Sequence, residues 1–430
     1  MTAEVQATPL GERLSDEALH GIIEDARVAL GRSAPSRAPL RSRSGVTWSS
    51  RKPLKEQEGG SAVNAAAHLS SADPLLASAL CVARSSGSTV VFMADRRRSQ
   101  LGVWQMADLV TPIAIRVAAT LRVADHLAAG RTVIEIAETE NVDADVLDRV
   151  LQHLADVGLF VSGYAGHYSL TERAEELRSD HPASVRALLD MDDALGRAEL
   201  SFADLLHSVR TGEAAFSVRF GRSFWVDLAA DSGRFASYAA AMGSDVAAWA
   251  PSILEGYDWG SLRHVVDVGG GDGSLLIAML GAHAGLRGTV LDLPEAADAA
   301  RERLRGAGLA ERSDVVSGSF FDPLPKGGDG YLLSAILHDW HDDAARAILG
   351  RCAEAAGPNG TVFVIEKIGP DGESVRTAMD LRMLAFFGGR ERGAAAIGAL
   401  GARVGLRLRE VHPAGELSIV QLTAAPGLRR

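Results

Sequence analysis

The sequence predicts an α/β protein, in which a doubly wound, mainly parallel sheet follows an N-terminal helical winged-helix domain. After residue 263, short apolar runs typical of strands alternate with helical segments. Such alternation is the pattern of parallel sheets covered by helices. Between Trp104 and Leu170, helical segments precede two short β-prone runs, which is the outline of a winged helix. The 430 residues exceed one typical core, so more than one domain is expected.

The strands of the predicted sheet are short runs rich in Val, Leu and Ile. The first four are expected at 265–268, 290–292, 315–316 and 331–333. A helix from Asp343 to Ala356 then precedes a fifth strand at 361–365. The last two runs, 406–409 and 417–422, are close enough in sequence to form an antiparallel hairpin at the sheet edge.

The first strand leads into the most informative loop of the chain. The apolar run His264–Val268 is followed by Gly269–Gly273, which holds four glycines and one Asp, and a helical segment begins at Ser274. Glycines are needed where a side chain would keep the backbone away from a ligand, and a helix N-terminus offers free N–H groups. Strand, tight loop and helix in this order predict a nucleotide-binding site.

The spacing of the glycines bears on the ligand. A dinucleotide fingerprint, G-x-G-x-x-G, would place its third glycine at position 274, which is Ser274. This counts against a nicotinamide oxidoreductase, which stays open as an alternative. Nineteen residues beyond Gly273, a second apolar run ends in Asp292. An acidic residue at the tip of the next strand can accept hydrogen bonds from both hydroxyls of a ribose.

The winged-helix region is predicted to serve dimerisation and to cap the substrate. Its second helix carries one Arg, Arg149, against four acidic residues, Asp143, Asp145, Asp148 and Asp156. These carboxylates would repel phosphate, and the formal charge of the whole chain is −11. No nucleic-acid partner is therefore expected, and a winged-helix regulator without catalysis is the less favoured alternative.

The first 98 residues are expected to be a largely flexible extension. A short helix is predicted from Leu14 to Leu30, and eight Arg or Lys residues without any acidic residue lie between Asp25 and Glu56. Such a segment cannot bury enough apolar surface to order itself. It is either a solvated linker or a contact for an acidic partner or peptide.

The sequence indicates a cytoplasmic protein that does not enter a membrane. The first residues lack the basic flank and apolar core of a signal peptide. The apolar stretch from Leu75 to Ala94 is interrupted by Arg84 and a polar tetrapeptide, so it does not predict a membrane span. Cys81 and Cys352 are too few and too far apart for a disulfide framework or a metal site.

Five segments resemble, in order, the motifs of the plant caffeate-type and actinobacterial antibiotic-tailoring O-methyltransferases: Asp267–Gly273, Leu291–Pro294, Gly318–Phe321, Leu337–Trp340 and Gly388–Arg392. These are class I enzymes that use S-adenosyl-L-methionine. The resemblance implies a homodimer with a dimerisation domain at 99–182, a helical linker and substrate-pocket segment at 183–256, and a Rossmann-like methyltransferase domain at 257–430.

The resemblance also implies which residues bind the cofactor. They are Asp267, Gly269, Gly271, Gly273, Asp292, Ser319, Phe320 and Ser334. Two of them depart from the family pattern. The family usually has Asp at the position of Ser319, near the adenine, so one cofactor hydrogen bond is expected to be weaker or of another kind. The plant enzymes have Lys at the position of Ser334, whereas anthracycline-type bacterial members have Ser there.

Methyl transfer from a sulfonium is an in-line displacement, so the protein must hold the acceptor oxygen and remove its proton. The family's general base maps onto His338, and the two acidic residues that steer it map onto Glu366 and Glu391. An imidazole is expected to titrate near neutrality and to accept the proton there. Relatives that use the cofactor for hydroxylation or decarboxylation lack this histidine, so His338 favours methyl transfer.

The acceptor is expected to be a small flat molecule. Met379, Asp380 and Met383 match the substrate-lining helix of the family, and Met suits an apolar ligand, although the same residues are equally typical of a helix core. An aromatic cluster in the helical segment is either core or one pocket wall: Phe216, Phe220, Phe224 and Trp225. We predict methylation of a hydroxyl on an aromatic or polyketide-like molecule of secondary metabolism. The alternative substrate is a peptide carboxylate or amine recruited by the basic arm.

Overall fold

The computed structural model describes residues 102–369, 371–373 and 375–425. The helix predicted at 14–30 and the basic arm lie outside the described residues. The chain divides into two units: helix α2 (Val103–Ala107) belongs to one, and the chain from Leu109 onward belongs to the other. Among the described residues, we find no helix with both the length and the apolar character needed to span a membrane.

The first part of the larger unit is a winged helix, as predicted. It consists of α3 (Val110–Thr120), α4 (Val123–Ala128), α5 (Val133–Glu140), α6 (Ala144–Asp156), a hairpin of β1 (Phe160–Ser162) and β2 (Tyr168–Leu170), and the 3-10 turn η2 (Glu172–Leu177). Thr132 and Glu135 form a capping box at α5, and the Asp143 carboxylate accepts the Val146 N–H at α6. Apolar faces of these helices and the hairpin share one core that includes Ile136, Leu151 and Phe160.

The segment from 183 to 256 is helical, as predicted. Its elements are α7 (Arg186–Leu189), α8 (Ala194–Glu199), η3 (Leu200–Asp204), α9 (Leu205–Thr211), α10 (Ala215–Phe220), α11 (Phe224–Ala229) and α12 (Ser232–Gly256), and the turn η4 (Trp259–Ser261) follows. The predicted aromatic cluster exists: the Phe216 ring lies 4.6 Å from Phe220 and 5.5 Å from Phe224. Phe386 and Phe387, from a helix far along the chain, pack against the same cluster.

The larger sheet has seven strands in the order β5-β4-β3-β6-β7-β9-β8. Their bounds are β3 (His264–Val268), β4 (Arg287–Asp292), β5 (Ser313–Ser317), β6 (Gly330–Ser334), β7 (Thr361–Glu366), β8 (Leu406–Ala414) and β9 (Leu417–Ala424). The first five of these are parallel, and β9 pairs antiparallel with both β7 and β8. The predicted doubly wound sheet and its edge hairpin are therefore confirmed.

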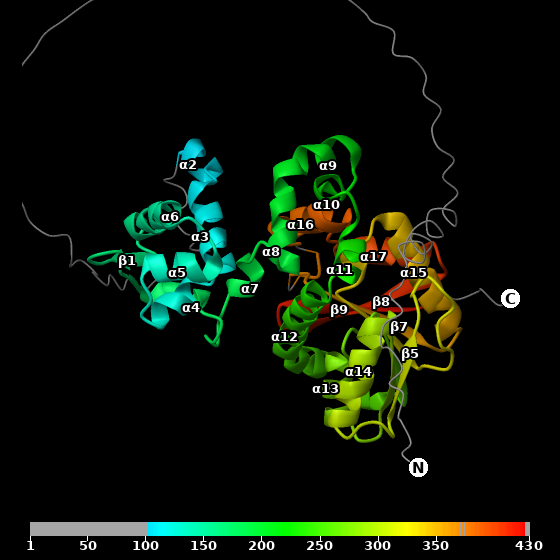
Figure 1. Ribbon diagram of the computed structural model, residues 1–430. Helices are drawn as coiled ribbons and strands as arrows, with labels where there is room; N and C mark the ends of the chain where they lie inside the picture. The colour runs from blue at the N-terminus through cyan, green and yellow to red at the C-terminus, as the bar shows by residue number, and fades with distance from the viewer. Residues whose placement is uncertain (1–101, 370, 374, 426–430) are drawn as a thin grey trace, which may run out of the picture. The chain divides into compact units, whose positions relative to one another are not determined.

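Helices pack against both faces of this sheet (Figure 1). They are α12, α13 (Ser274–Ala282), α14 (Pro294–Gly306), α15 (Asp342–Ala356) and α17 (Ala394–Ala402), whereas α16 (Thr377–Phe387) packs against the helices of the 183–256 segment. The strand order reverses at β3, whose neighbours are β4 on one side and β6 on the other. Ligands of such sheets bind beyond the carboxyl ends of the strands at this switch point. The glycine loop after β3 and the histidine after β6 both lie there.

Candidate active site

The glycine loop after β3 adopts a conformation that other residues tolerate poorly. Gly269, Gly271 and Gly273 have φ angles of +75°, +57° and +78°, in the left-handed region that favours glycine. A Cβ on Gly269 would lie 2.6 Å from the Ile336 side chain. A Cβ on Gly271 would meet no atom within 4 Å. The backbone at Gly271 thus borders open space, which a ligand can approach closely.

Two carboxylates flank this loop. The Asp292 side chain accepts the N–H of Gly271 through Oδ2 and the N–H of Leu293 through Oδ1, both at 2.7 Å. Each carboxylate oxygen has a second lone pair, so Asp292 can still accept hydroxyl donors. Asp267 is 1% exposed, and its Oδ2 has no hydrogen-bond partner in the protein. Burial, together with the charges of Asp292 and Asp272, raises the pKa of Asp267 to about 7.

The aromatic side of the cofactor region is formed by the segment after β5. The Phe320 ring packs edge-on against Phe321 and Trp340, with centroids 5.1 and 5.7 Å away. A Cβ on Gly269 would come within 3.5 Å of Phe320, which places this ring beside the glycine loop. Ser319 accepts the Phe321 N–H at 3.2 Å through its hydroxyl. The hydroxyl that replaces the family's carboxylate therefore already has a partner.

The predicted base lies on a short turn after β6. That strand ends at Ser334, and Ala335 has a φ of +54°, a left-handed conformation that costs a residue with a Cβ on the order of 1 kcal/mol. The chain then forms the 3-10 turn η5 (Leu337–Asp339), which carries His338. The N–H of Ala335 donates to the Ile365 carbonyl at 2.9 Å, which ties this bend to the adjacent strand β7.

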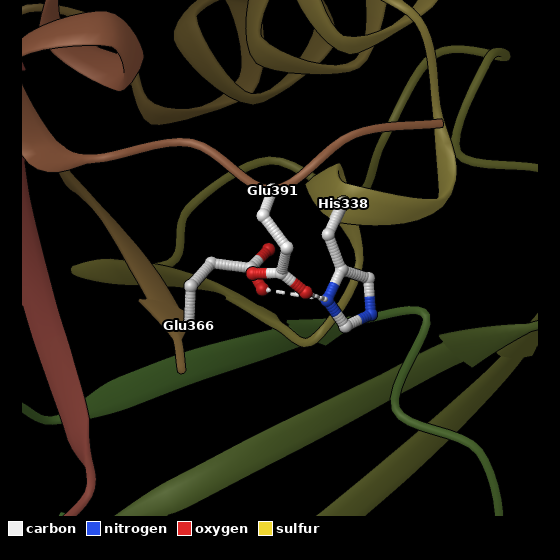
Figure 2. Close-up of side chains that lie close together, drawn as sticks. All are labelled: His338, Glu366 and Glu391. Atoms are coloured by element: carbon white, nitrogen blue, oxygen red, sulfur yellow. Dashed lines mark hydrogen bonds and ion pairs between the residues drawn. The ribbon is translucent and has the colours of Figure 1, made fainter. Parts of the chain in front are cut away.

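The structure brings His338, Glu366 and Glu391 together, although they come from three separate segments (Figure 2). His338 Nδ1 lies 3.1 Å from Glu391 Oε1 and 3.2 Å from Glu366 Oε2. Because ionised carboxylates only accept hydrogen bonds, Nδ1 must carry the proton, and Nε2 is then the nitrogen that can receive one. On that second side, Asp339 Oδ1 lies 3.4 Å from Nε2.

The electrostatics of this cluster differ from the sequence-based expectation. Burial would lower the pKa of His338, but the charges of Glu366, Asp339 and Glu391 outweigh it and raise that pKa to about 10. The expectation of titration near neutrality is therefore wrong for this histidine. Burial is also the main cause of the raised pKa of Glu366 and of Asp339, the latter to about 7. The neutral imidazole of His338 is an unusually strong base.

The three ligand-type atoms of His338, Glu366 and Glu391 lie within 4.8 Å of one another. Such a spacing can also hold a divalent cation, which the sequence did not predict. However, an Nδ1 that coordinates a metal cannot carry the proton that Glu391 accepts. The hydrogen-bonded arrangement and the metal-bound arrangement therefore exclude each other.

The predicted acceptor residues lie on α16. Met383 is buried, and Met379 is half-buried. Asp380 has a defined contact: its Oδ1 accepts the Glu391 N–H at 2.9 Å. Asp380 thus holds the backbone of the residue that contacts the base. Whether these three side chains touch an acceptor stays a prediction.

Three residues around the site were not singled out from the sequence: Tyr238, Asp339 and Arg392. The Tyr238 ring packs 5.5 Å from Phe224, and its pKa is raised well above the usual value by burial and by the charges of Asp339 and Asp292. The charges of the cofactor carboxylate and of the residue next to the base therefore both act on Tyr238. The Leu337–Trp340 motif contained a signal for Asp339, whereas no local pattern distinguishes Tyr238 from a core aromatic.

Comparison with known proteins gives a consistent result. A family model described as the O-methyltransferase domain matches residues 202–407, and one described as the O-methyltransferase dimerisation domain matches residues 104–180. The 2,7-dihydroxy-5-methyl-1-naphthoate 7-O-methyltransferase of Streptomyces carzinostaticus is 54% identical over 330 residues, which are 76% of this chain and 99% of that protein. The chain belongs to the O-methyltransferase family.

Other relatives in this family show both its structure and its chemical range. The crystal structure of the O-methyltransferase NcsB1 from neocarzinostatin biosynthesis, in complex with S-adenosylmethionine and 2-hydroxy-5-methyl naphthoic acid, matches with a TM-score of 0.72 and 54% identity, over 76% of this chain and 99% of that one. The aclacinomycin 10-hydroxylase RdmB of Streptomyces purpurascens is 40% identical over 332 residues, which are 74% of this chain and 89% of that protein.

This O-methyltransferase uses S-adenosyl-L-methionine, as predicted, and the alternatives of an oxidoreductase and of a regulator without catalysis are wrong. The residues present fit the cofactor. The backbone at Gly271 borders open space. Asp292 can accept further hydrogen bonds, and the buried Oδ2 of Asp267 has no hydrogen-bond donor from the protein. When bound, S-adenosylmethionine supplies an electrophilic methyl carbon on a sulfonium.

Proposed function

We propose that this enzyme methylates a phenolic hydroxyl of a planar, polyketide-like aromatic acid of secondary metabolism. The contact of His338 Nδ1 with two buried carboxylates carries the proposal. This arrangement holds the proton on Nδ1 and leaves Nε2 to take the acceptor's proton. The naphthoate substrate in the name of the 54% identical relative supports an aromatic hydroxyl as the target.

The basicity of His338 suits a phenol. An ordinary phenolic hydroxyl, such as that of Tyr, has a pKa of about 10, and an ordinary imidazole has one of about 6.5. Proton transfer between those two is strongly uphill. The carboxylates raise the pKa of His338 to about 10 after the opposing effect of burial, which brings the two groups level. Once His338 Nε2 has lost its own proton, the transfer from the acceptor oxygen therefore costs little free energy.

The aromatic cluster supports a flat acceptor. Trp225 and Phe387 are stacked at 5.2 Å with an interplanar angle of 13°, and the Tyr238 ring lies 5.8 Å from Trp225. The charge of Asp339, the residue after the base, acts on Tyr238, which supports placing this cluster beside the base. We propose that it forms one wall of the acceptor pocket and that Met379, Asp380 and Met383 lie on the helix that lines it.

We further propose that the enzyme is a cytoplasmic homodimer. We also propose the predicted division of the chain into an extension (1–98), a dimerisation domain (99–182), a helical pocket segment (183–256) and a catalytic domain (257–430). The dimerisation domain implies self-association. Leu109, Val110 and Ile113 at the start of α3 are 67%, 59% and 39% exposed, and a second copy would cover such an apolar strip. Cys352 is a buried free thiol, in keeping with a reducing compartment.

The acceptor is tested by incubating the full chain with S-adenosylmethionine and a panel of hydroxynaphthoic acids. Mono-, di- and non-hydroxylated members of the panel are compared, and release of S-adenosylhomocysteine is measured together with the mass of the product. We expect a mass gain of one methyl group only on hydroxylated members. A product that gains an oxygen atom instead would contradict O-methylation and would indicate chemistry like that of the hydroxylase relative. Turnover of short peptides but not of naphthoates would favour the peptide alternative. In that case, deletion of residues 1–92 should abolish the turnover of peptides.

A chelator separates the two arrangements of the His338 cluster. If Nδ1 carries the proton, turnover after dialysis against EDTA equals that of the untreated enzyme. Loss of turnover that Mg²⁺, Mn²⁺ or Zn²⁺ restores would show instead that a cation occupies the cluster.

A further inference from the structure

Arg392 is the one Arg or Lys side chain that is buried in the part of the chain that the structure describes, at 5% exposure. Its guanidinium donates through Nη1 to the carbonyl of Leu337 at 2.7 Å and through Nη2 to that of Trp340 at 2.6 Å. It also donates to Asp342 Oδ1 through Nη2 at 2.9 Å and through Nε at 3.0 Å. A third carbonyl, that of Arg390, accepts from Nη1 at 3.1 Å. All five N–H donors of the guanidinium therefore have an acceptor.

Two of the carbonyls that Arg392 binds bracket His338 and Asp339. One belongs to Leu337, the first residue of the turn, and it also accepts the Trp340 N–H at 3.2 Å; the other belongs to Trp340, just after the last residue. The Leu337 N–H donates to Glu366 Oε1 at 3.0 Å. A carboxylate therefore binds the first N–H of the turn, and a guanidinium binds the carbonyls at its start and just beyond its end.

The segment that carries Arg392 fits tightly against the turn. The Arg390 N–H donates to the His338 carbonyl at 2.9 Å. A Cβ on Gly389 would lie only 2.1 Å from that same carbonyl oxygen, so this position has room for glycine alone. Glu391 then extends to His338 Nδ1, and Arg392 to the backbone of the turn. Consecutive residues thus hold the imidazole and the turn that carries it.

Arg392 also brings a positive charge to a region where negative charge is buried. Asp339, Glu366 and Glu391 are at most 8% exposed, and uncompensated buried carboxylates are costly. Burial is the main cause of a lowered pKa of Arg392, and the charges of Asp342 and Glu366 oppose it. A guanidinium remains charged even in such surroundings, whereas an ammonium loses its proton more readily.

We propose that Arg392 is a positioning residue of the methyl transfer, which fixes the turn Leu337–Asp339 so that His338 Nε2 meets the acceptor hydroxyl. The proposal rests on the role of His338 as the base. The proposal predicts that Arg392 affects turnover rather than cofactor binding, because the hydrogen bonds of Arg392 go to the catalytic turn and not to the glycine loop.

The test compares Arg392→Gln and Arg392→Lys with the matched control Arg407→Gln. Arg407 is exposed on the edge strand β8, so this control removes the same chemical group away from the catalytic turn. We expect kcat to fall about 100-fold in Arg392→Gln, the scale of a displaced catalytic group. Arg392→Lys keeps the charge but not the fork, and we expect a loss of at least about tenfold. KM for the acceptor, the Kd of S-adenosylhomocysteine and all parameters of Arg407→Gln should change less than about twofold.

A double variant separates positioning from a general loss of structure. If Arg392 acts through His338, then His338→Ala combined with Arg392→Gln is no slower than His338→Ala alone. Losses that multiply would overturn the proposal, as would an unchanged kcat in Arg392→Gln. A His338→Ala variant with full turnover would overturn the role of the base itself, so the two failures differ. Should Arg392→Gln not fold, the milder Asp342→Asn removes one partner from a 54% exposed position and should lower kcat about threefold, whereas no change would contradict the proposal.

Discussion

The cofactor loop and the catalytic turn lie at the same edge of one sheet, yet they are built in different ways. The loop Gly269–Gly273 is shaped by backbone conformation within five consecutive residues, and its first N–H groups are bound by one neighbouring segment, through the Leu291 carbonyl and the Asp292 carboxylate. The catalytic turn is shaped by side chains from distant segments: Glu391 is 53 residues from His338, and Arg392 is 55 residues from Leu337. One site depends on local φ angles, and the other on tertiary contacts.

This difference separates binding from chemistry. A backbone cradle recognises the part of the cofactor that all methyltransferases of this class share, so it can be the same whatever the acceptor. The turn must place one nitrogen against one oxygen, and an error of about 1 Å is costly there. Substitutions in the loop should therefore change the affinity for the cofactor, and substitutions around the turn should change turnover.

The largest expected effect comes from His338→Ala. Removing the general base should lower kcat about 10²- to 10⁴-fold, while the Kd of S-adenosylhomocysteine stays nearly the same, because the charged partners of His338 are Asp339, Glu366 and Glu391 and not the glycine loop. Single-turnover kinetics and calorimetric titration measure the two quantities. Comparable turnover in this variant would show that proximity alone drives the reaction, as it can with an acidic phenol.

A second prediction concerns pH. Since the imidazolium of His338 must lose its proton before Nε2 can act, kcat/KM of the wild-type enzyme should rise as the pH rises toward a pKa of about 10. Glu391→Gln removes one of the charges that raise this pKa. The rising limb should then move about 1 to 2 units to lower pH, and kcat at its plateau should fall about tenfold because the base is weaker.

The control for this pH shift is Glu354→Gln, which makes the same chemical change on a 67% exposed side chain of α15. Its profile between pH 6 and 10.5 should match that of the wild type. The acceptor should have no titrating group in this range apart from the reacting phenol, whose ionisation is measured separately. If the midpoint of the rising limb of kcat/KM stays at the same pH in Glu391→Gln, or moves to higher pH, the electrostatic role of Glu391 is refuted.

The third prediction addresses the loop. Gly271→Ala forces a Cβ into a residue with φ of +57° and into the open space beside the backbone. We expect the Kd of S-adenosylhomocysteine to rise about tenfold or more, corresponding to roughly 1.4 kcal/mol or more, with kcat at saturating cofactor almost unchanged. The control Gly281→Ala lies within helix α13, where a Cβ meets nothing within 4 Å, so it should leave the affinity unchanged and stabilise the fold slightly. Equal effects of the two substitutions on the Kd would contradict the assignment of the Gly271 backbone to the cofactor site.

The same contrast explains what the sequence could predict. The glycine loop, the parallel strands and the winged helix were predictable because their signals are local: positive-φ glycines, β-branched runs and capping residues. The residues Glu366 and Glu391 came from the resemblance to a family, since no spacing along the chain indicates that they meet at one nitrogen. Arg390 and Arg392 look alike in sequence, but one is mostly exposed and the other is buried beneath the catalytic turn. The raised pKa of His338 has the same origin, because it depends on burial and on three carboxylates that only the fold assembles.

The smallest expected effect concerns the one place where the loop region departs from its family. The Ser319 hydroxyl accepts the Phe321 N–H and so has limited capacity left for the cofactor. In Ser319→Asp, one carboxylate oxygen can keep that bond while the other accepts from the adenine amino group. A hydrogen bond to a charged group contributes about 1.5 kcal/mol or less in such a partly exposed place, so the Kd of S-adenosylhomocysteine should fall about three- to tenfold. Calorimetry with S-adenosylhomocysteine and with its inosine analogue, which lacks the amino group, isolates this bond: Ser319→Asp should tighten binding of the first only. Equal tightening of both ligands, or weaker binding of the first, would mean that Ser319 does not face the adenine and that its replacement of Asp has no consequence for the cofactor.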